Sequence, residues 1–212
     1  MFARVGLQRL FPAFPVVESV TISTFAGLPS SFTVDMPATR PDGDLYLCVV
    51  CSLDENEFGT VDASWNSIAT EGGGVPSHPR IHAWQWVGSS EPSSYTVNLD
   101  AHSSGMAIIY RISGQHASPI DDSGTNHGGP TTAFNSVAVT TTTNATLLVV
   151  GSAADTGSIL TIPFIEDAKG EANGTYYGFS HQNIRATGTT ESGETTLNLS
   201  TYSTISIAIK GP

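Results

Sequence analysis

Positive charge is scarce in this chain of 212 residues. Eight lysines and arginines stand against 19 aspartates and glutamates, and Lys169 and Lys210 are the only lysines. The net charge of -11 would repel a phosphate backbone instead of neutralising it, so we expect no nucleic-acid partner. Apolar runs are also short. None approaches the length needed to span a membrane, so we expect no membrane association.

Cysteine and helical periodicity are nearly absent as well. Cys48 and Cys51 are the only cysteines, too few for a disulfide framework in a chain of this length. No long window carries apolar residues at helical spacing. The chain does contain 21 Gly, 12 Pro and many Thr and Ser, with only 13% charged residues. This composition favours short strands joined by turns.

Strand-like alternation recurs along the chain and predicts about a dozen strands. Ile205, Ile207 and Ile209 alternate with small or polar residues, which places one apolar face toward a core. Residues 45–53 and 106–112 are apolar at nearly every position. We expect these two segments to be central strands covered on both faces.

Segments of the first half of the chain recur in the second half. The matches relate 44–52 (DLYLCVVCS) to 144–152 (NATLLVVGS), 91–99 (EPSSYTVNL) to 191–199 (ESGETTLNL), and 108–114 (IIYRISG) to 205–211 (ISIAIKG). The first two share an offset of one hundred residues, and the third follows with a small deletion. Because neither half has enough strands to cover its own apolar face, we expect the halves to pack together.

The fold predicted from these patterns is all-β: an antiparallel β-sandwich of jelly-roll type built from two similar halves, about 18–117 and 131–212. Both halves would belong to a single sandwich over residues 18–212. Two independent domains are the alternative that the sequence leaves open.

The two cysteines lie in the first copy of the repeat, and the second copy has Leu148 and Gly151 in their places. Residues three apart in a strand point to opposite faces, with Cα atoms about 10 Å apart. That distance is too long for a disulfide. We interpret Cys48 and Cys51 as core residues.

An acidic loop follows this strand and carries oxygen ligands at Asp54, Asn56 and Glu57. These residues are weak calcium candidates, because the bidentate Glu that closes a calcium loop is missing at the required spacing. We favour a solvated acidic turn, there and at Asp121 and Asp122. We predict no metal and no cofactor.

No nucleophile elbow or acid/base pair stands out, so we predict that the protein is not an enzyme.

His82, Trp84 and Trp86 share one face of the segment 80–87, and Trp65 precedes them in the chain. An exposed row of aromatic rings can stack on sugars, so these four residues are candidates for glycan binding. The other interpretation is that they fill the core or a subunit interface. We favour the second, because exposed rows of Trp are unusual without a partner.

The order of several motifs resembles a known family. The motifs are residues 42–50 (DGDLYLCVV), Trp65, residues 84–97 (WQWVGSSEPSSYTV), residues 106–114 (MAIIYRISG) and residues 119–121 (PID). They resemble a β-sandwich domain that recurs in structural proteins of tailed phages and in some bacterial surface proteins. Its usual outline is a Gly-Asp-Leu strand, a Trp, an aromatic strand, a Glu-Pro-x-x-Tyr-Thr hairpin and a strand ending in Tyr-Arg. The resemblance is close over about residues 42–122 and loose over the second half. It implies a fold and a virion setting, and it brings no catalytic residue.

An apolar N-terminal arm, residues 1–17, precedes the predicted sandwich. Its apolar and basic side chains are Phe2, Arg4, Val5, Leu7, Arg9, Leu10, Phe11 and Phe14. Such an arm becomes ordered by burying its apolar surface. We expect it to anchor on a neighbouring subunit or to fold back on its own sandwich.

These features lead to the hypothesis of a non-enzymatic structural protein in a tailed-phage virion. It would decorate or stabilise the head, or form an accessory part of the tail. Its partners would be copies of itself, in a symmetric ring or trimer, and other virion proteins. The alternative is a carbohydrate-binding module that attaches the particle to a host surface glycan.

Overall fold

The computed structural model of the chain describes residues 13–27, 29–53, 58, 59, 61, 64–71, 78–99, 104–172, 174–190 and 193–212. The regular elements among these residues are all β-strands, and every strand pair is antiparallel. The predicted all-β, antiparallel class is therefore confirmed.

Seven strands come from the first half of the chain. They are β1 (Val16–Ala26), β2 (Ser31–Asp35), β3 (Leu45–Ser52), β4 (Asn66–Glu71), β5 (Arg80–Val87), β6 (Ser94–Asn98) and β7 (Ser104–Ser113). Five of them form one sheet in the order β1-β7-β3-β5-β4, while β2 and β6 form a separate two-stranded ribbon. The strand pairs β1 with β7, β2 with β6 and β3 with β5 are therefore nested inside one another along the chain.

The second half repeats this topology. Its strands are β8 (Ile120–Asn135), β9 (Thr140–Thr141), β10 (Thr146–Ala154), β11 (Ile159–Thr161), β12 (Ile165–Ala172), β13 (Thr175–Ile184), β14 (Gly188–Thr189) and β15 (Glu194–Lys210). The second sheet contains the path β15-β10-β13-β12, with β8 and β11 also pairing with β15, and β9 pairs with β14 as a ribbon. The pairs β8 with β15, β9 with β14 and β10 with β13 are nested in the same way as those of the first half.

The offset of one hundred residues is also present in the strand register. Residues 33–35 pair with 94–96, and residues 133–135 pair with 194–196. The next backbone hydrogen bond is repeated too, because the Met36 amide donates to Ser93 and the Ser136 amide donates to Gly193, each over 2.9 Å. The two halves thus share pairing geometry as well as strand order.

The third sequence match is displaced by two residues in the structure. Arg111 pairs with Tyr46, and Lys210 pairs with Thr146, so the register relates β7 to β15 at an offset of 99. The aligned letters imply an offset of 97. A shift of two residues keeps each side chain on the same face of a strand, so the hydrophobic pattern alone does not separate the two alignments.

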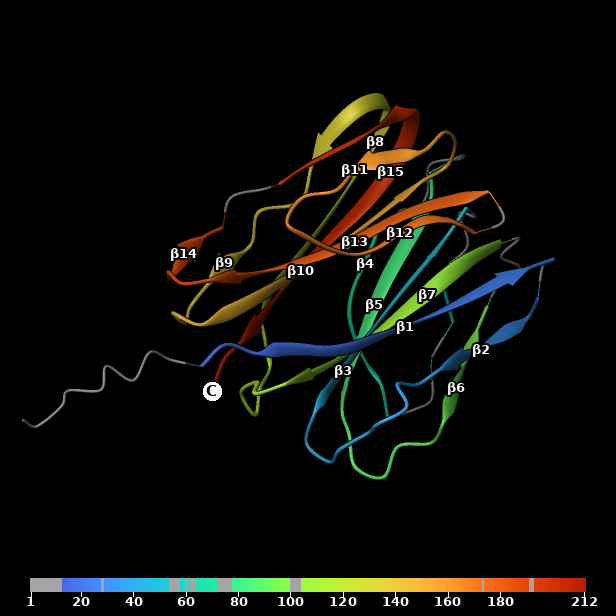
Figure 1. Cartoon of the computed structure of the whole chain (residues 1–212). Coiled ribbons are helices and arrows are strands. Elements are labelled where there is room, and N and C mark those ends of the chain that lie inside the picture. Colours follow the sequence, from blue (N-terminus) through green and yellow to red (C-terminus); the bar gives the residue numbers. More distant parts are fainter. Residues whose placement is uncertain are drawn as a thin grey trace, which may run out of the picture.

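The two sheets pack face to face and enclose the main core (Figure 1). Leu45, Leu47 and Val49 of β3 point into this core, where they meet residues of the second sheet such as Val149 and Ile207. The alternate side chains of β3 point to the opposite face, toward the ribbon of β2 and β6. All residues of β3, and most of β7, are buried, which confirms that these strands are covered on both faces.

Cys48 and Cys51 are buried, free thiols on opposite faces of β3. The residue that replaces Cys51 in the repeat, Gly151, lies where space is short. A Cβ atom there would lie 2.9 Å from the ring of Phe179 and 3.2 Å from Ile81 of the opposite sheet. The repeat therefore keeps a packing position and changes the volume that fills it.

Both thiols should be unreactive in the folded protein. Burial raises the pKa of Cys48 and of Cys51 to about 12, so only about one thiol in ten thousand is ionised at pH 8. We expect a chromogenic disulfide reagent to label native protein at least about 100-fold more slowly than unfolded protein. Labelling of two thiols within minutes under native conditions would contradict this placement.

Candidate functional site

The last residues of the predicted arm, its root, are part of the first sheet. Strand β1 begins at Val16, and Val16 and Val17 pair with Ser113 and Ile112, so the sheet includes the last two residues of the predicted arm. Just ahead of it, the Phe14 ring lies 4.9 Å from the guanidinium carbon of Arg185 in the second half of the chain. The other arm residues, Phe2, Arg4, Val5, Leu7, Arg9, Leu10 and Phe11, lie outside the described residues.

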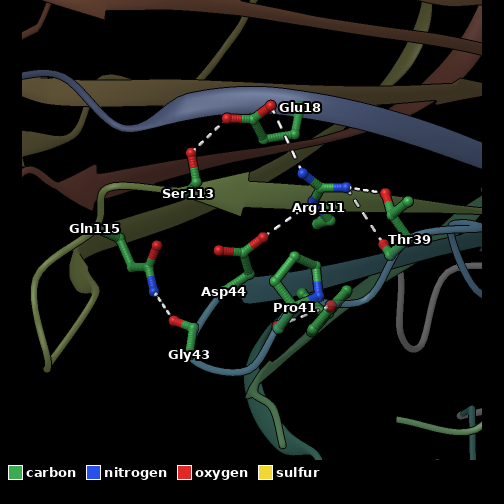
Figure 2. A network of polar contacts seen from close by, with 9 residues as sticks. Glu18, Thr39, Pro41, Gly43, Asp44, Arg111, Ser113 and Gln115 are labelled. Carbon is green, nitrogen blue, oxygen red and sulfur yellow. Dashed lines mark hydrogen bonds and ion pairs between the residues drawn. The ribbon is translucent and has the colours of Figure 1, made fainter. Parts of the chain in front are cut away.

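Arg111 of β7 is the centre of a polar network beside this root, which we call the Arg111 cluster (Figure 2). Its Nε lies 2.9 Å from Asp44 Oδ2, and its Nη2 lies 3.6 Å from Glu18 Oε2. Its Nη1 donates to the carbonyl and hydroxyl oxygens of Thr39. Ser113 Oγ donates to Glu18 Oε1 over 2.6 Å. The cluster therefore ties β1, β7 and the segment before β3 together.

The position of Glu18 depends on a β-bulge. The register of β1 against β7 shifts between Val17 and Ser19, which leaves Glu18 as the extra residue. A bulge redirects the side chain of the extra residue. Burial raises the pKa of the Asp44 carboxyl, and the positive charge of Arg111 beside it opposes that rise.

The turn before β3 requires a glycine. Gly43 has a φ of 87°, a conformation that side chains other than Gly rarely adopt. Its amide donates to the carbonyl of Gly88 over 2.8 Å, and its own carbonyl accepts from Gln115 Nε2 over 2.6 Å. Gly43, Asp44 and Arg111 thus hold the turn and the strand ends in place.

A second polar cluster joins the two sheets, and sequence reasoning missed it. Tyr110 of β7 is fully buried and donates to Asp167 Oδ2 over 3.0 Å, while Asp167 Oδ1 lies 2.7 Å from His181 Nδ1. Asp167 is the extra residue at a bulge in β12. Burial, followed by the charge of Asp167, raises the pKa of Tyr110 well above its ordinary value, so this phenol stays protonated and acts as a donor. Three residues on three strands leave no spacing signal in the sequence.

The four candidate residues for glycan binding lie together on the outer face of the first sheet, but they differ in exposure. Trp65 and Trp84 are only 7% and 4% exposed. His82 stacks on Trp84 with ring centroids 3.8 Å apart and planes 4° apart, and its Nε2 lies 2.8 Å from Ser67 Oγ. Trp86 is partly exposed. Trp86 is therefore the only one of the three tryptophans with an appreciable accessible surface for a ligand.

Trp86 lines a groove of about 520 Å³, which we call the Trp86 groove. The lining residues are Ser64, Asn66, Gln85, Trp86, Val87, Ala117, Ser118, Pro119 and Ile120. The groove lies where β4 begins at Asn66, paired with Gln85, so Trp86 and Val87 pair only with β3. The opposite wall, residues 117–120, is the connection from the first sheet to the second.

The other ligand candidates do not form a site in the described structure. Asp54, Asn56 and Glu57 lie outside the described residues. Asp121 and Asp122 accept hydrogen bonds from the backbone amides of Thr142 and Thr140, each over 2.6 Å, and so connect β8 to the segment around β9. Within the described ranges, no three His, Cys, Asp or Glu side chains are placed to hold a metal ion. No helix in those ranges has the length and apolar character needed to cross a membrane.

No protein-family model, curated protein or solved structure matches this chain.

Loss of the central arginine should destabilise the sandwich. Arg111→Met leaves the Asp44 carboxylate, whose side chain is 14% exposed, without its counter-charge. We expect a loss of about 2–4 kcal/mol in the free energy of unfolding, measured by urea denaturation at pH 7. The control is Lys169→Met, which removes a more exposed ion pair to Glu166 at 3.2 Å and should cost less than about 1 kcal/mol. Equal losses in the free energy of unfolding would show that the Arg111 cluster stabilises the fold no more than an exposed ion pair does.

His82 should make the fold sensitive to acid. Burial, followed by the charge of Arg80, lowers the pKa of His82 from 6.5 to about 4. Between these pH values the unfolded chain binds the proton more readily, so this contribution to stability is complete above pH 6.5 and is lost as the pH falls toward 4. Relative to His82→Phe, the wild type should lose up to about 3 kcal/mol from pH 7 to pH 4. The difference should be constant between pH 7 and 8. A difference that does not change with pH would contradict the neutral, buried histidine.

Proposed function

We propose that this protein is a non-enzymatic structural protein of a tailed-phage virion, anchored by its N-terminal arm. The observation that carries the proposal is the Arg111 cluster, which fixes the start of β1, directly after the predicted apolar arm, to β7 and to the segment before β3. Glu18, at the start of β1, contacts both Arg111 and Ser113. Because the residues that follow the arm are held in place, a partner that binds the arm would also fix the orientation of the whole sandwich.

The residues behind the resemblance to phage structural domains support this proposal by their contacts. Gly43 and Asp44 of the Gly-Asp-Leu strand meet Gln115 and Arg111. In the Glu-Pro-x-x-Tyr-Thr hairpin, the hydroxyl of Tyr95 donates to Glu91. These side chains are used for turns and packing, as expected of a structural domain.

We further propose that each half is a reduced jelly roll. A jelly roll results when a long antiparallel ribbon of two strands folds over, so its strand pairs are nested along the chain. Both halves have three nested pairs, two in the main sheet and one in the ribbon. In this proposal the chain contains two small rolls packed sheet to sheet, where the sequence predicted one jelly-roll sandwich over both halves.

The arm also supports assembly in copies. Its apolar residues gain order by burying surface on a neighbour, and an arm exchanged around an axis produces a closed ring or trimer. The acidic sandwich would face solvent, where like charge keeps particles apart. The partners in this proposal are copies of the same chain and other proteins of the head or tail.

A carbohydrate-binding, host-attachment module is the second candidate function. The observation that favours it is the Trp86 groove, which exposes an aromatic ring beside polar side chains. A virion protein can have both roles, because the arm root and the groove use different residues.

Removal of the arm should abolish attachment without unfolding the sandwich. The informative deletion is residues 1–12, because Val16 and Val17 belong to β1 and should be kept. We expect the melting temperature to change by less than about 2 °C and incorporation into particles to fall below about a tenth of the full-length level. Incorporation is measured by quantitative immunoblotting of purified particles.

The matched control is the full-length chain with Phe2, Leu7 and Phe11 changed to Ser. This variant keeps the length of the arm and removes its apolar anchors, so it should fail to the same extent. Full incorporation of both variants would disprove the anchoring role of the arm.

A further inference from the structure

We propose that the Trp86 groove binds the terminal residues of a neutral saccharide. This inference rests on the second proposed function, carbohydrate binding, and is independent of the arm. It assigns the ligand class and the residues that hold it.

The groove selects against anionic ligands. None of its nine lining residues carries a charge, and two of them, Asn66 and Gln85, present primary amides. An anionic ligand would find no cation there, in a protein of net charge -11. An uncharged ligand rich in hydroxyl groups suits amides and hydroxyls, which both donate and accept hydrogen bonds.

Trp86 provides a rigid apolar platform. Its ring centroid lies 6.2 Å from that of Trp65, with the planes 65° apart, and 5.9 Å from that of Tyr95. Contacts with two aromatic neighbours fix the rotamer of Trp86, so a ligand does not have to order this side chain on binding. The C–H face of a pyranose is the apolar part of a sugar that fits against such a ring.

Gln85 provides a buried polar atom in need of a partner. Its Oε1 is shielded from solvent and accepts no hydrogen bond from any described residue. Asn66 is its cross-strand partner on β4, so the two amides lie side by side at the groove. A buried acceptor without a donor is unfavourable, so the Gln85 side chain gains a partner when it turns this oxygen toward a ligand hydroxyl in the groove.

The size of the groove fits a short saccharide. Its volume of about 520 Å³ lies within the range of roughly 300–1,000 Å³ that is usual for small-ligand sites. Trp86 and Gln85 are neighbours on β5 and point to opposite faces of this strand, so the groove runs around the edge of the strand, with Ser118 on the other wall. A short saccharide that follows the groove would contact the aromatic ring at one end and the amides at the other.

The test is isothermal titration calorimetry of the full-length protein with neutral oligosaccharides of glucose, galactose, mannose and N-acetylglucosamine. Chains of the same length that end in sialic acid serve as charged probes. We expect at least one neutral series to bind, and its sialylated counterpart to bind at least about 10-fold more weakly. Equal or tighter binding of the charged chains would overturn the proposed ligand class.

Variants then locate the binding. Ser118→Tyr fills the groove from its exposed wall and leaves every aromatic residue of the cluster in place, and Trp86→Ala removes the platform. Each should weaken binding by about 10-fold or more, whereas Leu199→Ala, at a residue 64% exposed outside the groove, should not. If Trp86→Ala fails to fold, the effect of Ser118→Tyr alone decides whether the saccharide binds in the groove.

The remaining outcomes separate the two levels of the proposal. Neutral-sugar binding that survives Ser118→Tyr would overturn the groove assignment and keep the carbohydrate function. No binding to any saccharide would overturn both the groove assignment and the carbohydrate function. The virion role would still be decided by the incorporation of the protein into particles. A Trp86-dependent oligomer that forms without sugar, and that deletion of residues 1–12 abolishes, would show that the arm of another copy occupies the groove.

Discussion

Burial of the central strands on both faces is the constraint on which the rest of this structure depends. Strands β3 and β10 are buried at every position, and β7 at nearly every position. One face of each main sheet is covered by the opposite sheet. The other face needs separate cover. In the first half the ribbon of β2 and β6 covers it, and in the second half Val139, which precedes β9, packs there on Leu148 and Val150.

Burying a polar group inside such a sandwich is unfavourable unless it is paired, and two bulges supply such pairs. Glu18 and Asp167 are each the extra residue at a register shift, and each meets a partly or fully buried residue of β7, Arg111 or Tyr110. In a strand without a bulge, the side chains of these two acids would point in other directions and would not reach β7. A bulge re-aims a side chain at the cost of one ladder pairing. Tyr110 and Arg111 are consecutive in β7. Tyr110 therefore contacts the second sheet on one face, and Arg111 contacts the start of β1 on the other.

The sequence predicted what depends on periodicity. Alternation and the doubly apolar segments located the central strands, and the offset of one hundred residues reappears in the register of β2 with β6. The same alternation placed His82, Trp84 and Trp86 on one face of β5. The exposure of each ring depends on what covers it, and Trp65, which covers part of this face, comes from a segment without strand periodicity. Glu18 and Asp167 were missed because a bulge depends on the partner strand and leaves no local pattern.

The arm root and the Trp86 groove share one piece of chain. Ser113, the last residue of β7, donates to Glu18, Gln115 donates to the carbonyl of Gly43, and residues 117–120 then form the outer wall of the groove. His116 also donates its amide to the carbonyl of Lys210, at the end of the second sheet. The wall is thus fixed to both halves of the molecule. A groove between the first sheet and the connection to the second sheet keeps its shape only while the two sheets keep their relative position, and the hydrogen bond from Tyr110 to Asp167 between them serves that purpose. Attachment through the arm and recognition in the groove would then act through one rigid body, so a ligand held at Trp86 is positioned relative to whatever the arm binds.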